Sequence, residues 1–98
     1  MMRHVVMFRW KEGVEPAHAA ATAGALRRLP ALIPQIVEYA CGTDLGVAPT
    51  NFDFAVSARF ASLDDYITYR DHPEHQAVVQ SMIGPFVAER SAVQFDES

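Results

Sequence analysis

Hydrophobic residues recur with two different spacings along this 98-residue chain, and the two spacings predict its strands and helices. Residues 52–60 show the clearest strand pattern, with an aromatic or aliphatic residue at every second position. Runs rich in β-branched and aromatic residues at 3–10, 35–43 and 91–96 also predict strands. In the first of these, His4, Val6, Phe8 and Trp10 share one face.

Helical segments are predicted between these strands. Residues 17–29 are rich in alanine, and the short segment that follows, bracketed by two prolines, is expected to be a turn. Ser62 and Asp65 have the spacing of a capping box, which predicts a helix from residue 63 to about 70. Pro73 fits the first turn of another helix, reaching about residue 83. The order β-α-β-β-α-β predicts one domain over residues 1–98, α+β in class and ferredoxin-like in arrangement.

One face of such a sheet has no helix to cover it. Strand alternation gives that face an unusual number of apolar residues, namely Val5, Met7, Ile36, Ala40, Ala55, Val93 and Phe95. A partially apolar sheet face on a small domain is a candidate protein–protein surface. We therefore predict a homodimer in which the two sheets pack face to face.

Composition excludes several classes of function. The formal net charge is −4, and no basic stripe is present, which argues against nucleic-acid binding. The single cysteine, Cys41, rules out an internal disulfide framework and a multi-thiolate metal site. No run approaches the roughly 20 apolar residues of a membrane span, and no signal-peptide pattern is found, so a cytoplasmic location is expected.

The segment YRDHPEHQAVV carries the strongest candidate chemistry. With Pro73 at the first helical position, His72 is the N-cap and is expected to be structural. His75 falls in the first turn, where the helix dipole disfavours a protonated ring and favours a neutral general base. Val79, one turn later, extends an apolar stripe from His75. Tyr69 lies upstream as a candidate partner, although a hydrogen-bonded structural histidine fits these facts equally well.

The other candidates are less specific. His4 lies on an apolar strand face, where either a satisfied core histidine or a cavity residue is consistent with the pattern. Asp96 has the strand parity that would let it orient His75 or His4 if that face points toward the helices. A solvated acidic residue near the C-terminus is the alternative. The HxxH spacing without further nearby ligands predicts no metal site.

The segments RHVVMFRWKEGV, LRRLPALIP, FAVSARFASLDDYITYRDHPEHQAVV and VQFDE together resemble the stress-responsive A/B barrel (Dabb) family. This resemblance implies a dimeric α+β barrel built from ferredoxin-like protomers. By similarity to the plant olivetolic acid cyclase of this family, it implies a catalytic pair formed by Tyr69 and His75. It also implies a pocket lined by His4, Val6, Phe8, Val56 and Asp96. The first helix departs from the cyclase, so the substrate does not carry over.

Three functions agree with these features. The first is acid–base catalysis without cofactor or metal, in which a lyase or cyclase removes a proton α to the carbonyl of a small hydrophobic, polyketide-like compound. The second is a non-catalytic dimer that binds a small ligand or takes part in a stress response. The third is a cofactor-free monooxygenase, which only the architecture supports.

Overall fold

The fold is a four-stranded antiparallel sheet with helices on one side, seen in a computed structural model that describes residues 1–98. The strands are β1 Met2–Trp10, β2 Ile36–Thr43, β3 Phe54–Phe60 and β4 Val87–Asp96. The helices are α1 Pro16–Arg27, α2 Leu29–Leu32, α3 Leu63–Asp71 and α4 Pro73–Val78. The strand order β2-β3-β1-β4 confirms the ferredoxin-like βαββαβ arrangement. No helix has the length and apolar content needed to cross a bilayer.

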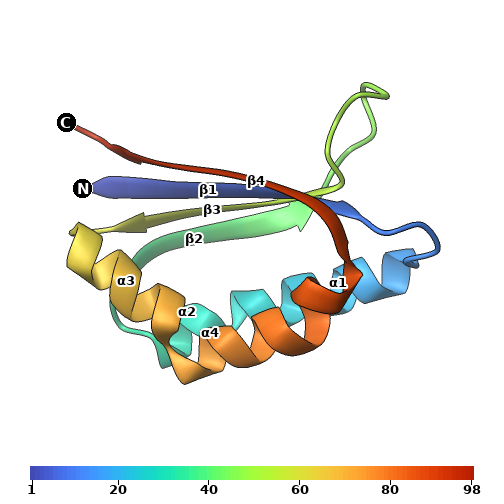
Figure 1. Cartoon of the computed structure of the whole chain (residues 1–98). Helices are drawn as coiled ribbons and strands as arrows, with labels where there is room; N and C mark the ends of the chain where they lie inside the picture. The colour runs from blue at the N-terminus through green and yellow to red at the C-terminus, as the bar shows by residue number, and fades with distance from the viewer.

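The helices all lie against the same face of the sheet (Figure 1). Strand alternation explains which face they cover, because Phe8, Phe54, Val56 and Phe60 all point toward the helices and are almost fully buried. Leu26 of α1, in the helical layer that covers these strand residues, is buried as well. The core therefore lies between sheet and helices, which also places the inward-facing polar residues of the strands close to α3 and α4.

Side-chain caps define the starts of α3 and α4. The hydroxyl of Ser62 accepts a hydrogen bond from the backbone N–H of Asp65, at 3.2 Å, as the capping pattern predicts. The ring of His72 accepts a bond from the N–H of Glu74, at 3.1 Å, which confirms its structural role as N-cap. After α4 the chain continues as a π-helical turn, Val79–Ile83, and a 3-10 turn, Gly84–Phe86.

Two predictions about element boundaries were incomplete. The segment expected to be a turn forms the short helix α2, which buries Leu29 and is followed by the fully buried Ile33. Proline is compatible with the first turn of a helix because the missing N–H has no partner there. Strand β4 begins earlier than predicted, at Val87, because it pairs with β1 as far as Trp10.

A β-bulge at Val37 corrects the predicted faces of β2. Ile36 pairs with Phe60 and Glu38 pairs with Arg59, so Val37 is an extra residue between the two pairs. Ile36 consequently packs against the core instead of joining the outer face, and Val37 is half exposed. Tyr39, beyond the bulge, packs against the core and reaches Tyr69 of α3.

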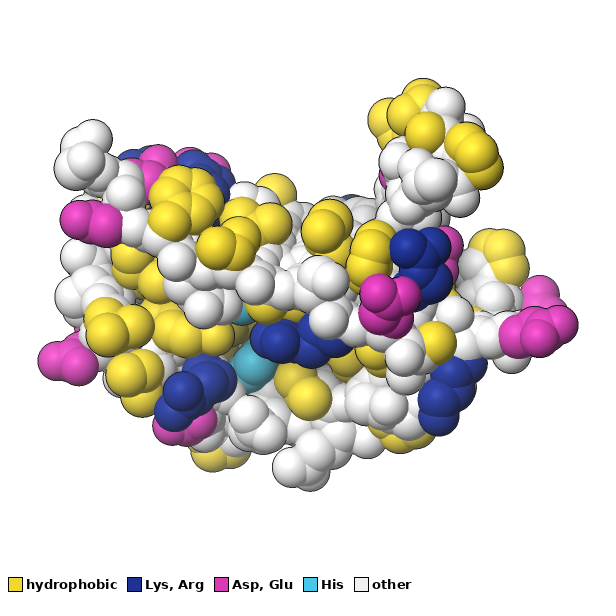
Figure 2. Space-filling view, turned by 45° about the horizontal axis from the view of Figure 1, so that its top comes forward, with side chains coloured by type: hydrophobic (Ala, Val, Ile, Leu, Met, Phe, Trp, Pro, Cys, Tyr) yellow, Lys and Arg dark blue, Asp and Glu magenta, His cyan; other side chains and the backbone are white.

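The outer face of the sheet has exposed apolar side chains on β1 and on the edge strand β4. Met7, Val93 and Phe95 remain 38–54% exposed there. The loop between β2 and β3 rises beside this face (Figure 1) and carries Leu45 and Val47, which are more than four-fifths exposed. Figure 2 turns this side toward the viewer and shows hydrophobic side chains on both the sheet and the projecting loop.

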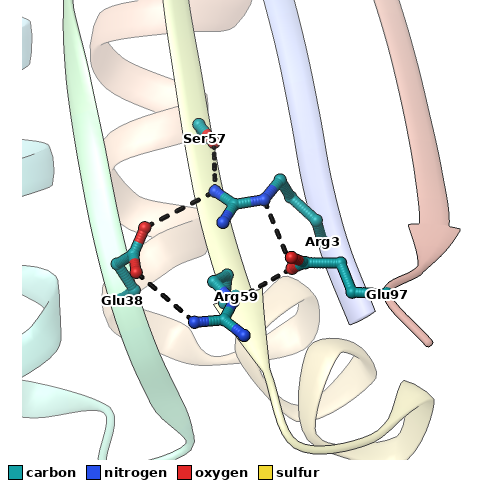
Figure 3. Close-up of polar contacts among 5 residues, drawn as sticks. All are labelled: Arg3, Glu38, Ser57, Arg59 and Glu97. Carbon is teal, nitrogen blue, oxygen red and sulfur yellow. Dashed lines mark hydrogen bonds and ion pairs between the residues drawn. The ribbon is translucent and has the colours of Figure 1, made fainter. Parts of the chain in front are cut away.

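A balanced ionic cluster borders one end of the outer face (Figure 3). Arg59 lies 2.9 Å from Glu97 and 3.6 Å from Glu38. Arg3 lies 3.3 Å from Glu97 and 3.5 Å from Glu38, and it donates a hydrogen bond to Ser57 at 2.9 Å. Each of the two guanidinium groups thus contacts both carboxylates, and the cluster carries no net charge.

Candidate functional site

A cavity of about 360 Å³ lies between the sheet and the helices. Ten of its sixteen lining residues are hydrophobic, and its polar groups converge from β1, β4, α3 and α4. This volume and composition are typical of sites for small organic molecules. Figure 2 shows histidine atoms next to cationic side chains, with hydrophobic atoms around them.

Tyr69 and His75 line this cavity together. Their ring centroids are 4.2 Å apart and the rings are tilted by 33°. Helix α3 ends at Asp71 and α4 begins at Pro73, so the turn between the helices places His75 against Tyr69. The two rings pack against each other without a direct hydrogen bond between their polar atoms.

The tautomer of His75 follows from its only side-chain hydrogen bond. Its Nδ1 lies 2.9 Å from the backbone carbonyl oxygen of Arg70, which can only accept, so Nδ1 carries a proton. In the neutral ring, Nε2 is therefore the basic atom. Burial lowers the pKa of His75 and outweighs the opposing effect of the Arg70 carbonyl. The ring is thus a neutral base at pH 7, and the leading cause is loss of solvent around it.

Tyr69 is joined to a second tyrosine. Its hydroxyl lies 3.0 Å from that of Tyr39, which reaches inward from β2. Burial raises the pKa of Tyr69 to about 12, while the hydrogen bond with Tyr39 acts in the opposite direction. Burial raises the pKa of Tyr39 above its usual range as well. Because Tyr39 can donate to Tyr69, the proton of Tyr69 is available to an acceptor in the cavity.

His4 contributes a hydrogen-bond donor to the cavity wall. The amide nitrogen of Gln94 donates to His4 Nδ1 at 2.9 Å, so in the neutral ring Nε2 carries the proton. His4 is 4% exposed, and its ring packs against that of Tyr66, with centroids 4.8 Å apart. Burial lowers the pKa of His4 to about 4, and the charge of Arg90 contributes to the shift.

Comparison with known proteins identifies the family. Residues 2–97 match the stress responsive A/B barrel domain (Dabb). The chain belongs to the Dabb family. An uncharacterised protein of Streptomyces coelicolor is 32% identical over 81 residues, which cover 81% of this chain and 84% of that protein.

Solved structures agree with this assignment. A dimeric ferredoxin-like protein of unknown function from Thermobifida fusca is 44% identical, with a TM-score of 0.90 over 98% of this chain and 90% of its own. A hydroxynitrile lyase from Passiflora edulis is 20% identical, with a TM-score of 0.83 over 99% of this chain and 94% of its own. At that identity, the likeness to the lyase establishes the fold alone.

Most of the predicted site residues of this Dabb chain meet in the cavity. Its lining includes the predicted pair Tyr69 and His75 and the predicted pocket residues His4, Val6, Phe8, Val56 and Val79. Asp96 does not line this cavity. It is exposed, pairs with Met2 in the sheet, and borders a separate surface hollow beside Leu63.

Asp96 and Gln94 share a parity along β4, but they lie opposite different residues of β1. Strand register places Gln94 opposite His4, so the residue in contact with His4 is Gln94 and not Asp96. His75 is oriented by a backbone carbonyl instead of a carboxylate. No group of three or more His, Cys, Asp or Glu side chains is arranged to hold a metal ion in this Dabb chain.

Several cavity residues were not predicted as site residues. Tyr39 has the same strand parity as Cys41, which is the sequence signal for its inward orientation, but that parity does not indicate its contact with Tyr69. Arg70, Gln76 and Arg90 also line the cavity. Their side chains are polar and lie near element ends or on an edge strand, so sequence pattern alone does not distinguish them from ordinary surface residues.

Proposed function

We propose that this Dabb protein is an acid–base catalyst acting on a small hydrophobic carbonyl compound. His75 Nε2 would remove a proton from the carbon α to the carbonyl, and the Tyr69 hydroxyl would donate a hydrogen bond to the developing enolate oxygen. The observation that carries the proposal is the fixed neutral tautomer of His75, packed against Tyr69 in an apolar cavity.

The surroundings of this pair support the same chemistry. The Tyr39 hydroxyl can donate a hydrogen bond to the Tyr69 hydroxyl. The protonated Nε2 of His4 supplies a second donor for an oxyanion. Proton transfer of this kind requires no cofactor or metal. The hydroxynitrile lyase of Passiflora edulis has the same fold, so the fold is compatible with lyase chemistry in that protein.

Turnover of a short polyketide-like β-keto thioester tests the proposal. We expect His75→Gln to reduce kcat by about 10²–10⁴-fold and Tyr69→Phe by about 10²-fold, the usual ranges for loss of a general base and of an oxyanion donor. His72→Asn retains an N-cap acceptor and is the matched control, with unchanged turnover. Equal turnover by wild type and His75→Gln would rule out the proposed base. Ligand binding without turnover, by the wild type as well as by the variants, would instead favour a non-catalytic binding protein.

We also propose that the protein is a homodimer formed through the outer face of the sheet. The similar protein of Thermobifida fusca is dimeric. The exposed apolar residues Met7, Val93 and Phe95 supply an interface centre, and the exposed Leu45 and Val47 flank it on the projecting loop. The ionic cluster bordering the face is internally neutral, so a partner can cover it without burying an unpaired charge.

Light scattering at micromolar concentration tests the assembly. The protomer mass is 10.9 kDa, so the wild type should give twice that mass. Val93→Glu places a charge on the apolar outer face, where Val93 is half exposed, and should give the protomer mass. Thr68→Glu, on the exposed side of α3, is the matched control and should remain dimeric. A wild type of protomer mass would refute this assembly.

A further inference from the structure

The charges that line the cavity differ from those of the whole protein. The chain has 12 acidic residues against eight Lys and Arg, yet the cavity lining contains two arginines and neither Asp nor Glu. A pocket with an excess of positive charge in an acidic protein favours anionic ligands over cationic ones. The two arginines of the lining, Arg70 and Arg90, differ in whether a carboxylate neutralises them.

Arg70 is already neutralised by its neighbour. Its guanidinium contacts both carboxylate oxygens of Asp71, at 2.9 and 3.1 Å, which is the bidentate geometry that carboxylates prefer. The two donors used in this pair are directed to Asp71 and not to the cavity. Arg70 contributes mainly its backbone carbonyl to the site, by accepting the hydrogen bond from His75.

Arg90 has no such partner. It lies in β4 opposite Phe8 of β1, on the face of the sheet that points toward the cavity. No carboxylate lies within ion-pair distance of it, whereas Arg3, Arg9 and Arg59 on the same sheet are all paired. An unpaired guanidinium at the edge of an apolar cavity has its full set of donors free for a ligand.

We propose that Arg90 forms a carboxylate-binding subsite at the cavity opening, and that the ligand is a carboxylic acid with an apolar body. This inference rests on the proposed function, because it takes the cavity as the substrate site. It adds the class of substrate, which is a hydrophobic carbonyl compound that carries a carboxylate. The carboxylate would pair with the Arg90 fork at the opening. The apolar body would lie along Val6, Val56 and Val79, toward Tyr69 and His75.

The electrostatics of the inner cavity are consistent with this orientation. Burial keeps the pKa values of His4 and His75 low, so neither ring carries a charge near pH 7. Arg90 is then the unpaired positive charge of the lining, and a ligand anion is stabilised at that end only. One guanidinium without a second unpaired cation suits a planar monoanion such as a carboxylate better than a phosphate ester.

Calorimetric titration with a matched pair of probes tests the subsite. The probes are 4-phenylbutanoate and its neutral analogue 4-phenylbutanamide, compared at low and moderate salt. We expect the wild type to bind the carboxylate at least about tenfold more tightly than the amide, with the preference decreasing as salt increases. Arg90→Gln should remove the preference by weakening the carboxylate only. Arg28→Gln, an exposed arginine outside the cavity lining, should behave like the wild type.

The outcomes separate this inference from the proposed catalysis. Equal affinity for the two probes, absence of binding by either, or an unchanged preference in Arg90→Gln would overturn the subsite. Unchanged amide affinity in Arg90→Gln shows that the fold is retained. A carboxylate preference that depends on Arg90, in a protein without turnover, would leave the subsite standing and refute only the catalysis.

Discussion

Acidification should destabilise this protein through His4 in particular. The folded chain holds His4 neutral, with a pKa of about 4 against an ordinary value of 6.5. Because the folded pKa is the lower one, the unfolded chain binds a proton first as the pH falls. The stabilisation is therefore complete above about pH 6.5 and is lost progressively as the pH falls toward 4.

The size of this effect follows from the two pKa values. The linkage relation gives a loss of about 2 kcal/mol in the free energy of unfolding at pH 5 relative to pH 7.5. The loss approaches about 3 kcal/mol below pH 4, since each unit of pKa difference corresponds to about 1.4 kcal/mol. This is a large fraction of the stability of a small domain.

Urea unfolding between pH 7.5 and 5 measures this loss, with the fluorescence of Trp10 as the signal. Trp10 is the only tryptophan and packs against Phe54, with ring centroids 5.6 Å apart. His4→Gln removes the titrating group, so the difference between wild type and variant isolates its contribution. His72→Asn is the control for loss of a histidine elsewhere and should keep the wild-type slope. Protein concentration is held fixed because a dimer gains stability with concentration.

Parallel pH profiles for wild type and His4→Gln would refute the reasoning. That result would mean that the His4 ring is as well solvated in the folded chain as in the unfolded one. The cavity wall would then be wetter than its burial indicates, and the neutral donor assigned to His4 would be lost at the same time.

Three further predictions concern the frame of the cavity. Tyr39→Phe and Tyr69→Phe should each lower the free energy of unfolding, measured in urea, by about 1–2 kcal/mol. The double variant should lower it little more than either single variant, because it leaves no unpaired hydroxyl. Additive losses would contradict the hydrogen bond between the two tyrosines. Leu26→Ala should lower the free energy of unfolding by about 2–5 kcal/mol in the same measurement. It should also enlarge the cavity, which binding of a larger probe ligand would detect. Ser62→Ala should cost about 1 kcal/mol by removing the acceptor for the Asp65 N–H, and Ser62→Asn should restore stability.

The sequence was sufficient to predict the faces of β1 and β3, because alternation there has no exception. The residue patterns alone did not place Tyr69, His75 and His4 in one cavity; the resemblance to the Dabb family implied it, and all three line the cavity. In β2 the residues Ile36 and Val37 are both apolar, so no pattern identifies which of them is the extra residue. Only the pairing with β3 decides that question.

Positions along β4 depended on register, which sequence pattern does not contain. Gln94 and Asp96 share a parity, and either could face His4 until the pairing of β4 with β1 is known. The importance of Arg90 likewise became visible only when the surrounding carboxylates could be located. An exposed arginine on an edge strand is ordinary, so its sequence position does not distinguish it. That no carboxylate lies near it can be seen only in the three-dimensional structure.

The bulge in β2 has a consequence for how this strand tolerates changes in length. The extra residue Val37 lets Ile36 and Tyr39 both face inward, although they are three positions apart. Removing Val37 would restore regular alternation and leave both side chains on the same face as before. Removing a residue after it, such as Ala40, would instead shift Cys41 to the opposite face. Position 37 is therefore the point at which β2 can lose one residue while Tyr39 keeps its hydrogen bond with Tyr69.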